Sequence, residues 1–122
     1  MGLDMYAYTT LTALPSQVDF PEPPDAERLY VWRKHPKLHG WMEALYFRKG
    51  GKNPEFNLSA VAIDAADLDR LESDVRGNRL PETDGCFFGV SSGTETEGDL
   101  AFIGKARASV AAGRTVLYVA WW

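Results

Sequence analysis

His35, His39 and Glu43 form the sequence pattern that most resembles a chemical site, because they recur at a spacing of four residues. On a helix this spacing places the three side chains roughly in line on one face. Two histidines one turn apart can share a divalent metal ion, with a glutamate as the third ligand. A histidine pair without a further ligand is weak evidence, however. We therefore favour a simpler interpretation, a solvent-facing side of the helix that binds no metal.

A second candidate site combines Asp4, Arg33 and His39, which come from three separate segments. We expect Asp4 on the non-core face of a first strand, Arg33 at the end of a second, and His39 in the first turn of a helix. If the strands are neighbours, these side chains gather near one sheet edge. Arg33 and His39 could then hold an anion, or Asp4 could orient His39 as a general base. We favour a structural Asp4–Arg33 ion pair, with His39 capping the helix or hydrogen-bonded to backbone, because buried polar groups usually satisfy one another.

Covalent and nucleotide-dependent chemistry find no support in the sequence. The only cysteine, Cys86, precedes two phenylalanines in an apolar segment, an environment that makes a thiol inert. The chain has no Gly-x-Ser-x-Gly motif, phosphate-binding loop or dinucleotide fingerprint. Two carboxylate pairs, Asp67 with Asp69 and Glu95 with Glu97, fit ordinary solubilising residues. We therefore expect no cofactor.

The composition is that of one globular domain, which we expect to span residues 1–122. A chain of this length buries enough surface for a core without disulfides, and 45% of its residues are hydrophobic. The single cysteine favours a reducing, cytoplasmic setting. No apolar run approaches the roughly 18 residues of a membrane span. The first ten residues contain Asp4 and no basic residue, so we expect neither a secretory signal nor membrane association.

Basic side chains are concentrated in residues 28–52, although the net charge of the whole chain is −4. This segment contains seven lysines and arginines against a single acid, interleaved with tyrosines and tryptophans. Phosphate contacts combined with aromatic stacking are typical of single-stranded nucleic-acid binding. The acidic remainder of the chain opposes such a partner, so we rank nucleic acid below other ligands. The candidate ligand contacts here are Trp32, Arg33, Lys34 and His39.

Periodicity predicts five strands and three helices. Apolar and polar alternation with β-branched and aromatic enrichment indicates strands over residues 3–9, 28–33, 56–63, 86–91 and 115–122. Helical spacing indicates a first helix from Pro36, with the apolar stripe Leu38, Trp41, Met42 and Leu45. A second helix follows Asp64 as N-cap, and a third covers about residues 97–112.

The order of these elements predicts an α+β fold with a mixed four- to five-stranded sheet and about three helices packed mainly on one face. Residues 14–25 contain four prolines and are expected to form an irregular excursion rather than an element.

Several motifs together resemble an uncharacterised family of small proteins encoded by bacteria and their phages. These are the opening MGLDMY, a segment similar to YWRKxxxIHxW (Trp32-Arg33-Lys34, Leu38-His39 and Trp41), GCFFG at residues 85–89, and the aromatic terminal strand. The sequence departs from the family pattern at Val31, where tyrosine is usual, and at Cys86, where phenylalanine is usual. The resemblance implies no activity or cofactor, and it places a histidine at position 39 but not at position 35.

The sheet face turned away from the helices is expected to carry Tyr6, Tyr8 and either Trp121 or Trp122. An exposed aromatic face favours self-association, most simply as a dimer, or a protein partner. We therefore predict a non-enzymatic binding or interaction protein, plausibly an accessory or phage-derived one. The alternative is a small enzyme that acts on a phosphorylated or carboxylated substrate through the Asp4, Arg33 and His39 cluster.

Overall fold

The computed structural model describes residues 4–33, 35–56, 58–77, 79–80 and 96–121. Its elements, in chain order, are β1 (Asp4–Thr10), β2 (Glu27–Arg33), α1 (Pro36–Arg48), β3 (Val61–Ile63), α2 (Ala65–Arg76), α3 (Thr96–Ala111) and β4 (Thr115–Trp121). None of the helices in these residues is long and apolar enough to cross a membrane. The strand expected over residues 86–91, with Cys86 and Glu95 nearby, lies outside the described part of the chain.

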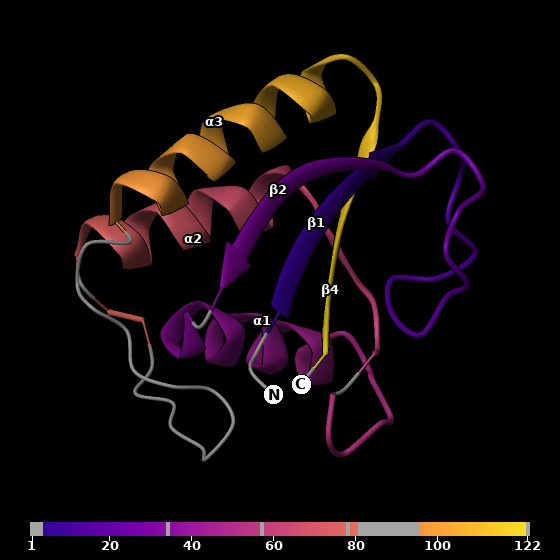
Figure 1. Ribbon diagram of the computed structural model, residues 1–122, viewed down its shortest axis with the longest axis horizontal. Helices are drawn as coiled ribbons and strands as arrows, with labels where there is room; N and C mark the ends of the chain where they lie inside the picture. The colour runs from indigo at the N-terminus through magenta and orange to yellow at the C-terminus, as the bar shows by residue number, and fades with distance from the viewer. Residues whose placement is uncertain (1–3, 34, 57, 78, 81–95, 122) are drawn as a thin grey trace.

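The four strands form one sheet in the order β2-β1-β4-β3, with every neighbouring pair antiparallel (Figure 1). The prediction of a mixed sheet is therefore wrong for the described strands. The chain passes through two helices, α2 and α3, between β3 and β4. A single crossover helix would make the two strands parallel, whereas the second helix reverses the chain once more and leaves them antiparallel. The predicted single α+β arrangement is confirmed.

All three helices pack on one face of the sheet, as predicted (Figure 1). The strands contribute alternate residues to this core, among them Met5, Ala7 and Tyr118, and the helices contribute Leu38, Leu68 and Phe102, among others. Alternation along each strand then directs the intervening side chains to the opposite face.

Helix α1 follows the sequence pattern closely. It begins at Pro36 and buries the predicted stripe against the sheet. The residue after the helix, Lys49, donates its backbone N–H to the carbonyl of Leu45, and Gly50 takes φ of +98°, a conformation that glycine adopts at little cost.

Helix α2 begins with a capping box. The Asp64 side chain accepts the backbone N–H of Asp67, and the Asp67 side chain accepts the backbone N–H of Asp64. Asp67 is buried and also contacts the ammonium of Lys49 at 2.6 Å and the guanidinium of Arg70 at 2.6 Å. The interpretation of Asp67 as a solubilising residue is therefore wrong, because its carboxylate joins the start of α2 to the end of α1.

The strand predicted over residues 56–63 is shorter in the structure. Phe56 and Leu58 have φ of +54° and +61°, which takes the chain out of the extended conformation before Val61. Phe56 is fully buried and packs against the rings of His39 and Tyr46. Its apolar character reflects that core position and not a strand.

The face of the sheet away from the helices, the open face, includes Tyr6, Tyr8, Val31, Val119 and Trp121. Beside it, Phe20 from the proline-rich excursion packs on Leu117 and Ala62 and covers the β3 side of the sheet. The expected tyrosines are present on the open face, and Trp121 is the terminal tryptophan that accompanies them; Trp122 lies outside the described residues.

Candidate functional site

The structure brings Asp4 and Arg33 together but places His39 elsewhere. Asp4 is half-buried, and its Cα is the direct partner of Arg33 across the β1–β2 pair. Asp4 alternates with Met5, which belongs to the core, so Asp4 is on the open face. His39 is fully buried on the helix side of the sheet. The three residues therefore share no single cleft.

His39 is a polar member of the core. Its Nδ1 is hydrogen-bonded to the hydroxyl oxygen of Tyr118 at 2.7 Å, and its ring stacks on Phe56 with centroids 5.2 Å apart. Burial lowers the pKa of His39 to about 4 and raises the pKa of Tyr118 well above its ordinary value. Both groups are therefore neutral near pH 7, which suits a structural hydrogen bond inside the core.

Acidification should destabilise the protein through His39. The unfolded chain binds a proton at this residue below about pH 6.5, whereas the folded chain binds it only near pH 4, so stability is lost as pH falls between these values. We expect the free energy of unfolding to fall by about 2 kcal/mol between pH 7 and pH 5 from this residue alone.

Urea unfolding at both pH values, compared with His39→Gln, measures that contribution because all other groups are common to the two proteins. The glutamine amide retains a hydrogen-bonding group near Tyr118 but does not titrate. Equal pH dependence in the two proteins would contradict the assignment.

His35 is also buried and does not lie on a solvent-facing side of α1. Its Nε2 lies 2.8 Å from Oδ2 of Asp99 in the first turn of α3, and Trp32 Nε1 donates to the other oxygen of Asp99 at 3.2 Å. The predicted solvent-facing interpretation of His35 and His39 is therefore wrong. Within the described residues, no three metal-ligating side chains gather at one point. Glu43, the third weak candidate, is half-buried, and burial raises its pKa.

The aromatic side chains of the basic segment are mostly in the core and do not form a stacking platform. Trp32, Trp41 and Tyr46 are buried, and their polar atoms are bonded to Asp99, Asp74 and Asp19, respectively. Lys34 lies outside the described residues. These three aromatic side chains, which suggested base stacking, are thus used for packing.

The open face carries a row of stacked rings. The rings of Tyr8 and Tyr6 have centroids 6.2 Å apart with an interplanar angle of 19°, and those of Tyr6 and Trp121 are 4.6 Å apart at 23°. The guanidinium carbon of Arg28 lies 5.3 Å from the Tyr6 ring centroid, a cation–π geometry. Val31 stands directly opposite Tyr6 in register and is 43% exposed.

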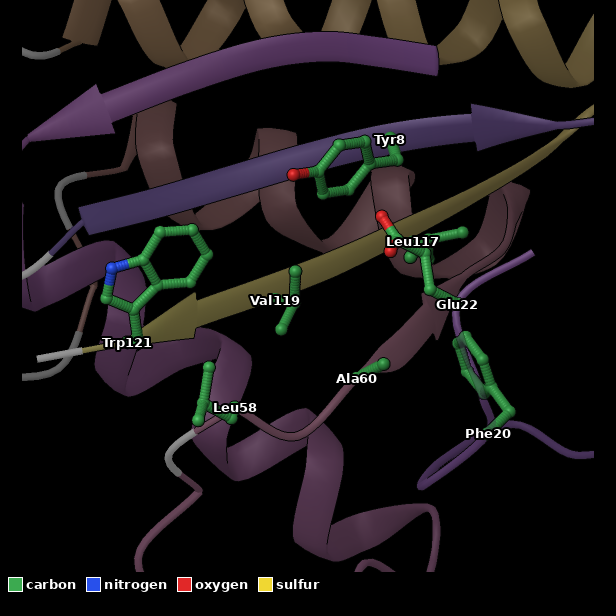
Figure 2. Close-up of a pocket in the computed structure, with 8 residues that line it drawn as sticks. All are labelled: Tyr8, Phe20, Glu22, Leu58, Ala60, Leu117, Val119 and Trp121. Carbon is green, nitrogen blue, oxygen red and sulfur yellow. The ribbon is translucent and has the colours of Figure 1, made fainter. Parts of the chain in front are cut away.

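A groove of about 350 Å³ lies next to this row, above β4 (Figure 2). Leu117 and Val119 form its floor. Tyr8 and Trp121 line it on the side of the row. The other lining residues, which come from the excursion and from the segment before β3, are Phe20, Glu22, Leu58 and Ala60.

Sequence reasoning found the ring row but missed the groove. Tyr6, Tyr8 and Trp121 are revealed by strand alternation, whereas Phe20 and Leu58 lie in irregular segments that only the fold brings together. The sequence feature that could have indicated the groove was the proline-rich excursion, whose backbone pairs with β3 through Val18 and Val61. No protein-family model matches the chain, and no curated protein or solved structure matches it either.

Proposed function

We propose that this protein is a non-enzymatic binding module whose open face associates with a second copy of the chain in a two-fold dimer. The supporting observation is the stacked row of Tyr8, Tyr6 and Trp121 on the sheet face opposite the described helices. Tyrosine and tryptophan are the residues that protein interfaces favour, because each combines a large apolar ring with a polar group.

Exposure of apolar side chains is concentrated on and beside this face. Val31, Leu58 and Trp121 are 43%, 68% and 38% exposed, and they account for three of the five large hydrophobic side chains exposed in the described chain. A contiguous apolar surface of this kind marks an interaction site more often than scattered single residues do.

A two-fold dimer is the commonest soluble assembly, which favours a second copy of the chain as the partner. In such a dimer the same patch is used by both copies, so the ring row of one copy packs on the ring row of the other.

Sedimentation equilibrium over the micromolar to submillimolar range tests this proposal. We expect a dimer mass for the native chain and a monomer mass for Val31→Lys, which places a charge opposite Tyr6, the middle ring of the row. Phe47→Lys is the matched control because Phe47 is 41% exposed on α1. A native chain that remains monomeric throughout, or a Phe47→Lys change that dissociates the dimer equally, would overturn the proposal.

The proposal also places the protein in the reducing cytoplasm of a bacterium, as an accessory or phage-derived protein. The single cysteine and the resemblance of its motifs support this setting. The enzyme alternative has less support, because His39 is in the core while Asp4 is on the open face.

A further inference from the structure

We propose that the groove above β4 is a binding site for a small amphiphilic cation, an apolar chain or ring that ends in one ammonium group. The site is open to solvent, and its volume of about 350 Å³ falls at the lower end of the range for small-molecule sites. This inference goes beyond dimer formation, and it concerns the groove beside the ring row on the same sheet face.

The apolar part of the ligand is indicated by the walls. Val119 and Leu117 form a floor of aliphatic carbon, and the rings of Phe20 and Trp121 stand at opposite ends (Figure 2). Since the floor follows alternate residues of β4, it offers an elongated surface along the strand. A chain of several methylene groups lying on this floor would remove both its own surface and that of the groove from water.

The charge of the ligand is indicated by Glu22, the only charged residue in the lining. Its carboxylate points toward the Tyr8 side of the groove (Figure 2). Burial is the main cause of the raised pKa of Tyr8, followed by the negative charge of Glu22, whose effect is larger than the opposing effect of Arg28. An ammonium group at this end would meet the carboxylate and the electron-rich face of an aromatic ring together. An anionic ligand would be repelled there.

The backbone of Leu58 supplies an independent observation. Leu58 has φ of +61°, which is unfavourable for a bulky side chain, and its backbone N–H is fixed by a hydrogen bond to the carbonyl of Ala120 at 2.9 Å. This conformation holds a leucine that is 68% exposed at the rim of the groove. Backbone strain that keeps an apolar side chain in solvent fits a residue that covers a ligand.

The groove and the proposed dimer contact share Tyr8 and Trp121, but each also has residues of its own. Leu58 and Glu22 line the groove on the β3 side of β4, whereas Val31 lies on β2 at the far edge of the sheet. Variants at these positions therefore separate the two proposals: Val31→Lys should abolish dimerisation and leave ligand binding intact, and Glu22→Gln should weaken binding of the cation and leave dimerisation intact.

The test is a titration of the ¹⁵N-labelled protein with hexylammonium, followed by the amide signal of Val119 and the indole signal of Trp121. Hexan-1-ol and hexanoate serve as probes of the same length with neutral and negative ends. We expect saturable shifts with hexylammonium at the millimolar affinity usual for so small a ligand. Hexan-1-ol should bind more weakly, and hexanoate should bind least.

Two variants test the charged contact and the apolar contact of the groove separately. Glu22→Gln should weaken hexylammonium by about fivefold, the upper end for a partly solvated ion pair, and leave hexan-1-ol unchanged. Leu58→Gly should weaken both probes without loss of thermal stability, because glycine suits the positive φ. The proposal is overturned if hexylammonium gives no saturable shift, or if Glu22→Gln weakens both probes equally. It is also overturned if the groove signals follow protein concentration alone, which would mean that a second copy occupies the groove.

Discussion

Replacing Trp41 with alanine should lower the free energy of unfolding by about 3–5 kcal/mol, the range for loss of a large buried aromatic side chain. Trp41 is 8% exposed in the core between α1 and the sheet. Its indole N–H also donates to Oδ2 of Asp74 in α2 at 2.8 Å, so the substitution removes a link between two helices as well as packing. Urea denaturation monitored by circular dichroism measures the loss.

Phe47→Ala is the control for this measurement, because Phe47 belongs to the same helix and is 41% exposed. The control should change stability by less than about 1 kcal/mol, as surface substitutions usually do. If Trp41→Ala and Phe47→Ala unfold at the same urea concentration, the stripe on α1 does not carry the packing assigned to it.

The second large effect is expected at Asp67, whose replacement by alanine should cost about 3 kcal/mol or more. The carboxylate accepts the Lys49 ammonium and the Arg70 guanidinium, and it completes the cap of α2. Lys49 is largely buried between α1 and α2, where its Nζ also donates to the carbonyl of Ala62 at 2.6 Å. Without Asp67, this charge keeps only neutral acceptors in a poorly solvated position.

Asp69→Ala is the matched control, since Asp69 is the same residue type on the same helix and its side chain is 73% exposed. Its ion pair with Arg107 is solvated and should contribute little. Adding Lys49→Met to Asp67→Ala should recover part of the lost stability, because the uncompensated charge is then gone. Equal unfolding curves for Asp67→Ala and Asp69→Ala would contradict a buried ion pair.

The local rules of the sequence were enough to predict most of the elements. Pro36 at the start of α1, Asp64 at the start of α2 and the alternation of Tyr6 and Tyr8 each act within a few residues, so they are readable without the fold. The exception was the segment before β3. There Phe56 is apolar because it fills a core position in an irregular segment.

The candidate sites were less predictable because their partners are distant in sequence. His35 and His39 look like surface residues until Asp99 and Tyr118, which are 64 and 79 residues further along the chain, are placed beside them. The groove likewise depends on Phe20, whose contact with β4 is set by the tertiary path of the proline-rich excursion. Spacing rules contain no information about such pairings.

The position of β1 has a consequence for how the chain is made. This strand lies between β2 and β4, and its pairing with β4 joins Asp4 to Trp121 and Thr10 to Thr115 (Figure 1). At roughly 5–20 residues per second of translation, β1 leaves the ribosome on the order of 5–20 s before β4, its partner strand on one side. During that interval the side chains of Met5 and Ala7 cannot yet pack into the core of a completed sheet. Closure of the fold is thus a late event governed by non-local pairing, and the unpaired edge of β1 is open to aggregation until β4 emerges.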